Sequence, residues 1–201
     1  MKTIFKTNLV IIALLLAMGI NAQDKPLTFG IKAGANLSNL GGDDTEDLSA
    51  KAGFNAGVTL DFALASDLYL LTGLEYSTKG TKNGDVKLNL GYLQLPVHLG
   101  YKLEVVDGTK LVFHAGPYLG YAASGQWKAE GVSIDAFGDE VDQLEVTKLK
   151  RFDFGLGLGV GAELGKIGVG LGYDFGLANL FDTSEAKVRN MNAYLTVGYK
   201  F

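Results

Sequence analysis

The segment Arg151-Phe-Asp-Phe-Gly-Leu-Gly-Leu-Gly-Val-Gly-Ala-Glu-Leu164 decides the fold, because its residues alternate strictly between two kinds. Every second position, from Phe152 to Leu164, is apolar. The positions between them are occupied by four glycines and by charged residues near both ends. Successive side chains of a strand point to opposite faces, so the pattern predicts a long strand with one bulky apolar face and one small or charged face.

The same alternation recurs along the rest of the chain. It returns at 29–38, 51–64, 68–79, 92–102, 110–124, 167–179 and 190–201, which makes eight predicted strands in all. Each spans about ten to fourteen residues, whereas strands of soluble proteins usually have about five or six. Leu88 and Leu90 are out of phase with Leu93. A β-bulge near Gly91 would reconcile them.

The connections between these strands differ in length. Those near 65–67 and 165–166 are tight and 103–109 is modest, whereas those at 39–50, 80–87, 125–150 and 180–189 are longer and polar. Short turns at one end, long loops at the other and an even strand number are typical of outer-membrane barrels. We therefore predict an all-β fold, an eight-stranded antiparallel up-and-down transmembrane β-barrel.

A soluble eight-stranded barrel with its apolar face turned inward is the rival architecture. It would expose the glycine face to water and crowd the bulky face into a narrow lumen. A membrane barrel faces lipid with the apolar row and closes every strand edge, as a bilayer requires. The aromatic residues support it, because they fall into two predicted belts flanking an aliphatic band: Phe54, Tyr76, Tyr121, Phe152, Phe154, Tyr173 and Phe175 externally, and Phe29, Phe62, Tyr101, Phe113, Tyr199 and Phe201 on the periplasmic side.

Residues 1–22 form a predicted secretory signal peptide. Lys2 and Lys6 precede an apolar run from Leu9 to Ile20, which is followed by Asn21 and Ala22. A basic start, an apolar middle and a small residue before the cut are the layout of such a signal. The run is too short for a membrane anchor, which needs about 20 apolar residues. We expect cleavage after Ala22, which leaves 23–201 as one barrel domain.

Composition excludes several classes of function. The 201 residues include no Cys, which removes disulfide scaffolds, thiol catalysis and cysteine-zinc sites. The net charge of −4 offers no electrostatic footprint for nucleic acid. Gly is abundant, with 28 residues. By strand phase, 17 of them face the lumen, where we expect them to make space for long charged side chains. Substitution of Gly157 and Gly170 by Leu should therefore hinder closure of the barrel.

Several segments resemble the outer-membrane β-barrel family common in Bacteroidetes, described as porin-like or PorT-like. The matching stretches are Phe29-Gly-Ile-Lys-Ala-Gly-Ala-Asn-Leu-Ser38, Tyr92-Leu-Gln-Leu-Pro-Val97, Ala115-Gly-Pro-Tyr-Leu-Gly-Tyr121, Phe152-Asp-Phe-Gly155 and Tyr173-Asp-Phe-Gly-Leu-Ala-Asn-Leu180. The resemblance implies an eight-stranded barrel in the outer membrane of a Gram-negative bacterium. It implies no agreed molecular activity, although some relatives take part in secretion of other proteins.

Charged residues on the face opposite the apolar row are predicted to point into the lumen. They are Lys32, Lys51, Asp61, Glu75, Lys79, Arg151, Asp153, Glu163, Asp174 and Lys200. Eight strands leave room for side chains and little else, and buried charges are tolerated only when paired. We therefore expect a lumen filled by a polar network, with a gated pore lined by the same charges as the alternative.

His98 and His114 also face inward by the same phase, on consecutive strands. Two histidines are a weak sign of a metal site, which needs a third or fourth ligand. A hydrolase would need a nucleophile and an orienting carboxylate beside one of them. We expect a structural role for both, and no catalytic residue, cofactor or metal.

The loops and the C-terminus hold the remaining candidate sites. Trp127, Val132, Ile134 and Phe137 alternate within 125–150, which predicts a hairpin beyond the bilayer, with exposed apolar groups such as Trp127 and Phe137 able to bind a protein partner. Acidic clusters in the loops suggest a solvated surface or divalent-ion bridging to lipopolysaccharide. The final Tyr199-Lys200-Phe201 looks like the signal read by the barrel-assembly machinery.

These observations predict a non-enzymatic structural or interaction protein that acts through its extracellular loops. Its expected partners are outer-membrane lipid, lipopolysaccharide, the barrel-assembly machinery and a protein at the loops, with no nucleic acid. A small-solute porin-like channel and an accessory barrel of a protein secretion system are the alternatives, because function resides in sites and not in the fold.

Overall fold

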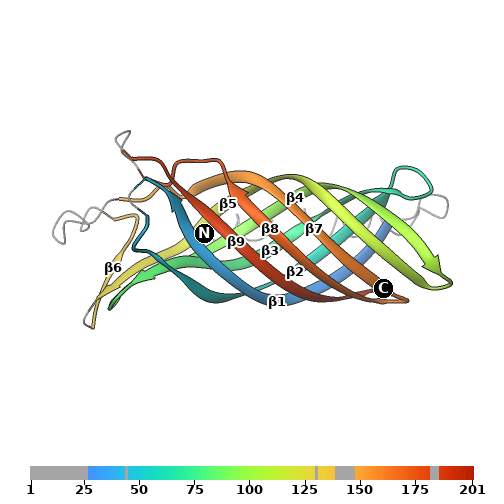
Figure 1. The fold of residues 1–201 in the computed structure, drawn as a ribbon, viewed down its shortest axis with the longest axis horizontal. Helices are drawn as coiled ribbons and strands as arrows, with labels where there is room; N and C mark the ends of the chain where they lie inside the picture. Colours follow the sequence, from blue (N-terminus) through green and yellow to red (C-terminus); the bar gives the residue numbers. More distant parts are fainter. Residues whose placement is uncertain (1–26, 44, 130, 139–147, 182–185) are drawn as a thin grey trace, which may run out of the picture.

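The structure, a computed structural model, describes residues 27–43, 45–129, 131–138, 148–181 and 186–201. It shows a closed antiparallel barrel, elongated along its axis (Figure 1). The barrel strands are β1 (Leu27–Gly42), β2 (Ser49–Ala63), β3 (Leu68–Asn83), β4 (Val86–Val106), β5 (Thr109–Ala129), β7 (Phe152–Leu164), β8 (Ile167–Gly176) and β9 (Val188–Lys200). Each pairs with the next, and β9 pairs with β1, so the predicted eight-stranded fold is confirmed.

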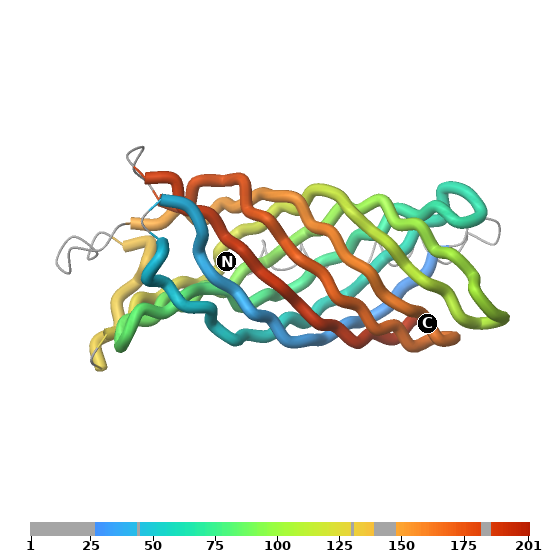
Figure 2. Tube along the Cα trace, viewed as in Figure 1, coloured from blue at the N-terminus to red at the C-terminus, as the bar shows by residue number. Residues whose placement is uncertain are grey.

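The two ends of the barrel differ, and they are named here by their connections. The turn end carries the short β2–β3, β4–β5 and β7–β8 connections and the C-terminus, and the loop end carries the longer β1–β2, β5–β7 and β8–β9 connections together with the β3–β4 turn (Figures 1 and 2). In outer-membrane barrels the short turns are periplasmic and the longer loops extracellular. The predicted signal peptide and its cleavage after Ala22 lie outside the described residues. Among the described residues, no helix is long and apolar enough to cross a membrane.

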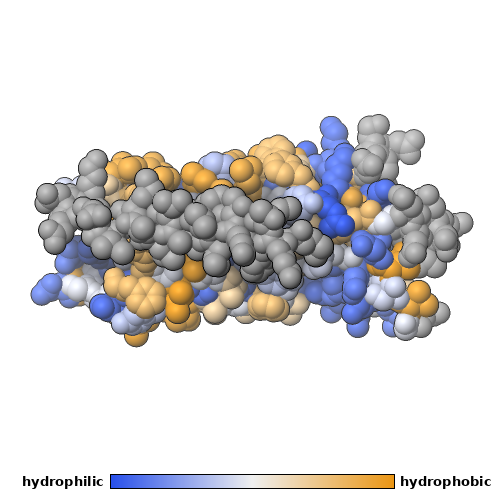
Figure 3. Space-filling view, turned by 180° about the vertical axis from the view of Figure 1, so that it is seen from behind, coloured by the Kyte–Doolittle hydropathy of each residue, from blue (hydrophilic) through white to orange (hydrophobic). Residues whose placement is uncertain are grey.

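The strand phases agree with those read from the sequence. On β7, for example, Phe154, Leu156 and Leu158 are exposed on the outer wall, whereas Asp153 is fully buried. Where the wall is not covered by grey atoms, Figure 3 shows apolar residues along the middle of the barrel and hydrophilic residues toward both ends. Each of the eight barrel strands is paired on both edges, which is the arrangement that a hydrocarbon environment demands of β structure.

One predicted long connection is wrong. Instead of a loop at 80–87, β3 and β4 continue to Asn83 and Val86 and meet in a tight turn, with Gly84 at φ +54°. The sequence at 80–87 does not alternate between apolar and polar residues, but the backbones of β3 and β4 remain paired there. Inward-facing Thr81 supports this continuation, since its single hydroxyl proton has two acceptors within reach, Asn39 Oδ1 (2.7 Å) and the Ser49 carbonyl (3.0 Å).

The expected bulge near Gly91 exists, but its extra residue is on the neighbouring strand. Gly91 pairs with Ser124 and Tyr92 pairs with Ala122, so Ala123 of β5 is the inserted residue. β4 itself stays in phase. Leu88 and Leu90 therefore point inward with Tyr92, and all three are buried at the loop end of the lumen.

The predicted hairpin within 125–150 is confirmed. β5 runs 21 residues to Ala129 and returns as β6 (Val132–Asp135), which pairs only with β5 among the described residues. A transmembrane strand needs about 9–11 residues. β4 and β5 are therefore long enough to extend well beyond the bilayer, and β6 adds a third strand to that extension.

Candidate functional site

The loop end of the lumen is closed by an apolar cluster, here called the cap. Its buried members are Leu40, Leu88, Leu90, Tyr92, Ala122, Ala136, Phe137, Leu149, Leu180 and Val188, against which Leu48, Trp127 and Phe181 pack. They come from several strands and from the segments that follow β6 and β8. Side chains in such a cluster are removed from water on all sides, which stabilises the fold by about 1.5–3 kcal/mol for each large one.

Two residues predicted as an exposed partner surface belong to this cap. Phe137 is only 9% exposed, and Trp127 is half-buried against the cluster. Gly125 makes the burial possible, since a Cβ there would lie 2.4 Å from the Phe137 ring. The Arg151 guanidinium lies 4.1 Å from the centre of that ring. The expectation that these apolar groups are exposed is therefore wrong.

Below the cap, a fully buried lysine lies between two carboxylates. Lys79 Nζ is 3.9 Å from Asp153 Oδ2 and 3.9 Å from Asp174 Oδ2. The rings of Tyr118 and Tyr92 flank the ammonium, with their centres 4.7 Å and 5.4 Å away. Carboxylates and aromatic faces both attract a cation, so this layer offsets part of the desolvation cost of the buried charge.

The middle of the lumen holds an ion pair and both histidines. Lys32 Nζ lies 2.5 Å from Glu75 Oε2. The His98 and His114 rings are stacked, with centroids 5.0 Å apart and Nδ1 atoms 2.9 Å apart. The inward orientation predicted for both is thus confirmed. In the described part of the chain, no group of three or more His, Cys, Asp or Glu side chains could hold a metal ion.

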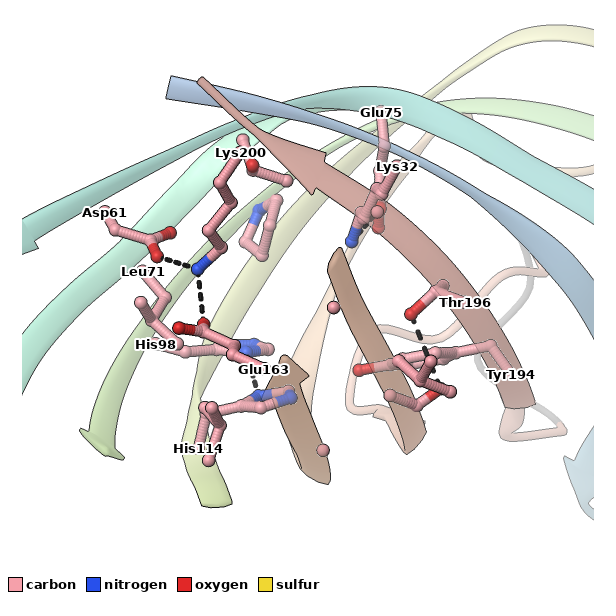
Figure 4. A pocket seen from close by; sticks show the side chains of 18 of the residues that line it. Lys32, Asp61, Leu71, Glu75, His98, His114, Glu163, Tyr194, Thr196 and Lys200 are labelled. Atoms are coloured by element: carbon pink, nitrogen blue, oxygen red, sulfur yellow. Dashed lines mark hydrogen bonds and ion pairs between the residues drawn. The ribbon is translucent and has the colours of Figure 1, made fainter. Parts of the chain in front are cut away.

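The turn end is crossed by a four-residue charge cluster. Lys102 Nζ donates to Asp61 Oδ2 at 2.6 Å and lies 2.9 Å from Glu163 Oε1. Lys200 contacts the same two carboxylates (Figure 4). The strands that carry these residues are not all neighbours, so the cluster ties β2, β4, β7 and β9 together across the lumen.

Eight of the ten charged residues predicted to point into the lumen take part in these contacts: Lys32, Asp61, Glu75, Lys79, Asp153, Glu163, Asp174 and Lys200. Arg151 instead contacts the cap, since its Nη1 donates to the Ala122 carbonyl at 3.1 Å and its guanidinium lies over the Phe137 ring. Lys51 is half-buried near the loop end and forms no ion pair with a described residue. Sequence reasoning missed Lys102, although its even number is in phase with inward-facing His98.

Glycines of β7 and β8 face the larger side chains of the lumen. A Cβ at Gly155 would lie 2.7 Å from the Tyr118 ring, and one at Gly157 or Gly159 would meet His98 or His114 at 2.8 or 2.4 Å. The expectation that glycine makes space therefore holds here, although aromatic and imidazole rings fill most of it. Gly168 differs, because no atom lies within 4 Å of where its Cβ would stand.

The space beside Gly168 belongs to a cavity of about 160 Å³ in the turn-end half of the lumen (Figure 4). Asp174, Gln94 and His98 line its inner part, and Glu163, Gly168 and Lys200 line the part nearest the turn end. The lumen is thus filled at the loop end but retains an open space farther down, which the sequence did not indicate.

The C-terminal aromatics lie on the outer wall at the turn end. The rings of Tyr199 and Phe201 are nearly perpendicular, with centroids 5.4 Å apart. Phe201 is 70% exposed, and its backbone N–H donates to the Phe29 carbonyl at 2.9 Å. Their place at the apolar–polar boundary is the one expected of a periplasmic aromatic belt.

Solved structures of small outer-membrane barrels are similar in overall course. The attachment invasion locus protein Ail of Yersinia pestis is 15% identical over 87% of this chain and 98% of that chain, with a TM-score of 0.46. Neisserial surface protein A is 16% identical over 88% of this chain and 99% of that chain, with a TM-score of 0.49. OprG of Pseudomonas aeruginosa is 13% identical over 88% of this chain and 97% of that chain, with a TM-score of 0.46. No curated protein is significantly similar to the chain in sequence.

The family comparison is more extensive. The family model described as "Outer membrane protein beta-barrel domain" matches residues 21–182, which is most of the chain. It supports the general barrel family, and the finer PorT-like resemblance stays a prediction. The closed eight-stranded sheet, the apolar outer wall and the polar lumen are the features that such a family requires. The chain therefore belongs to the outer membrane protein β-barrel domain family.

Proposed function

We propose that this outer-membrane barrel is a non-enzymatic structural or interaction protein that acts through its extracellular loops and does not conduct solutes. The observation that carries the proposal is the cap. Its buried residues close the loop end of the lumen, and fully buried Lys79 and Asp153 lie directly beneath it. A solute crossing the barrel would have to displace both layers.

The cap also gives the extracellular surface a defined shape. It holds the β4–β5 extension and the segments after β6 and β8 against one another. At the hairpin tips, Val86 and Val132 are 38% and 53% exposed. A surface that is already ordered loses less conformational entropy on binding, so it suits recognition of a protein partner.

Recordings from the purified protein in planar bilayers test the pore. We expect no steady conductance from the wild-type barrel, because its lumen is closed by packed side chains. A porin-like channel is the second candidate, and it would produce large, steady, voltage-independent steps. Such steps from correctly folded protein would overturn the proposal.

Site-specific photo-crosslinking in intact cells tests the interaction role. A photoreactive amino acid at Val132 stands on the exposed hairpin tip, and the matched control at Asp107 stands in the β4–β5 turn at the opposite end. We expect one discrete adduct that forms from position 132 and not from position 107. Adducts from both positions, or from neither, would contradict a partner at the loops.

Two further partners are part of the proposal. One is lipopolysaccharide, which forms the outer leaflet around such a barrel. The other is the barrel-assembly machinery, which we propose recognises Tyr199 and Phe201. A role as an accessory barrel of a secretion system would appear in the crosslinking experiment as an adduct with a secretion component.

A further inference from the structure

The inner end of the lumen cavity, here called its floor, is formed by Asp174, Gln94 and His98. These side chains are 3%, 2% and 5% exposed. Gln94 Nε2 donates to Asp174 Oδ2 at 3.0 Å, and His98 Nδ1 is engaged with His114 Nδ1. The other polar atoms of the Gln94 and His98 side chains, Gln94 Oε1 and His98 Nε2, are buried and have no hydrogen-bond partner among the described residues.

The free atoms at this floor can accept hydrogen bonds. An amide oxygen and an ionised carboxylate only accept, and an imidazole nitrogen accepts when the other ring nitrogen carries the proton. His98 Nε2 is an acceptor when His98 Nδ1 donates to His114. A buried acceptor without a partner is unfavourable, so the floor is complementary to a ligand that donates hydrogen bonds.

The floor also carries an uncompensated negative charge. The Lys79 ammonium is shared between Asp153 and Asp174, so two carboxylates face one cation. The other ion-paired groups of the lumen balance, since Lys32 pairs with Glu75 and two lysines meet two carboxylates at the turn end, and Arg151 and Lys51 lie farther toward the loop end. A positive charge beside Asp174 would complete the layer.

Access to the cavity is from the turn end. The Lys79 layer and the cap lie between the floor and the loop end. Toward the turns, the side chains of Lys200 and Glu163 are 22% and 15% exposed, and Gly168 leaves the wall open. The volume of about 160 Å³ is comparable to a cavity of about 150 Å³ that holds benzene.

We infer that the cavity is a binding site for a small organic cation that donates hydrogen bonds, namely an amine, amidine or guanidine that enters from the periplasmic side. Its cationic head contacts Asp174, Gln94 Oε1 and His98 Nε2, and its remaining atoms occupy the space beside Gly168. This site does not involve the loop surface, so it stands apart from the proposed interaction role.

Three probes of nearly equal shape test both charge and cavity: benzamidinium, benzamide and benzoate, which carry charges of +1, 0 and −1. Each is titrated calorimetrically into the folded full barrel in neutral detergent micelles at low ionic strength. We expect benzamidinium to bind about tenfold more tightly than benzamide, because a buried carboxylate favours the cation, and benzoate not to bind. In nitrogen-15 NMR spectra, the imidazole signals of His98 should shift with benzamidinium, should shift only at higher concentrations of benzamide, and should not shift with benzoate.

Two variants locate the site. Asp174→Asn removes the charge and leaves Lys79 balanced by Asp153, so it should abolish the preference for benzamidinium over benzamide. Gly168→Leu keeps every polar group and fills the open space, so it should abolish binding of benzamidinium and of benzamide while the barrel still folds. If one variant fails to fold, as judged by heat-modifiable migration in gels, the other still provides the test.

The inference is overturned if benzamidinium does not bind, or if it binds no better than benzamide. It is also overturned if the folded Gly168→Leu barrel binds benzamidinium as well as the wild type does, because binding would then occur at the detergent or the outer wall. None of these results depends on the loop surface, so the crosslinking experiment stands or fails separately.

Discussion

Lys102 of β4 and Asp61 of β2 are joined by a hydrogen-bonded ion pair of 2.6 Å, although β3 lies between their strands. Lys102 is 5% exposed and Asp61 is 4% exposed. The pair therefore crosses the inside of the barrel. It shows that the inward charges are arranged for partners on other strands rather than for neighbours along the sheet.

Lys102→Met should be strongly destabilising. It leaves Asp61 and Glu163 with only Lys200 as a cation, and removal of one partner from a buried ion pair typically costs about 3–5 kcal/mol. Urea titration of the barrel in lipid vesicles measures the free energy of unfolding. Lys200→Met is the matched control and should cost less, since the Lys200 side chain is 22% exposed. Equal losses from the two variants would contradict the account.

The glycines at positions 157 and 170 should respond differently to enlargement. A Cβ on Gly157 would lie 2.8 Å from the His98 ring, whereas one on Gly170 would meet only Thr196 Oγ1 at 3.3 Å and, more distantly, the Val160 carbonyl. Overpacking of a closely packed interior typically costs about 1–3 kcal/mol. Gly157→Leu should reduce the heat-modifiable folded fraction, and Gly170→Leu should retain it. A similar loss from both would favour the simpler expectation that both glycines are needed for closure.

Phe201→Ala should lower the amount of assembled barrel in cells without lowering the stability of barrel refolded in detergent. The substitution keeps the backbone hydrogen bond to Phe29 and removes only an exposed ring. If the assembly machinery recognises Phe201, the amount of assembled barrel should fall while the stability of the refolded barrel stays unchanged. Phe62→Ala, which removes another exposed ring near the turn end, is the control and should assemble normally. Equal assembly of the Phe201→Ala variant and the wild type would exclude the signal.

Three lysines stand directly opposite one another on the outer face near the loop end, since Lys82 pairs with Lys87 and Lys87 with Lys128. Like charges in cross-strand pairs are destabilising. Lys87→Glu should therefore raise the hydrogen-exchange protection of the β3–β4 hairpin by about two- to fivefold for each pair, and Lys87→Gln by less. At high salt the gain should disappear, because exposed charges are screened. A gain that persists at 1 M salt would point to a cause other than charge.

The outer wall could be predicted residue by residue, and the interior could be predicted only as a set of inward positions. Apolar residues such as Phe154 and Leu156 predict the lipid-facing side of a strand, because contact with hydrocarbon is required of every second residue of every barrel strand. Leu88 and Leu90 break that pattern for a reason located elsewhere. They belong to the cap, whose other buried members come from β1, β4, β5, β9 and the segments after β6 and β8.

The alternation of residues, by itself, determined the class of fold, the number of barrel strands and the face that side chains occupy within the alternating segments, because strand phase is a local property with a period of two. The tertiary structure alone decided that Lys102 meets Asp61, that Ala123 is the bulged residue, that Phe137 is buried and that a cavity remains beside Gly168. These contacts depend on the stagger between strands and on closure of the sheet, which bring together side chains from strands that are not neighbours.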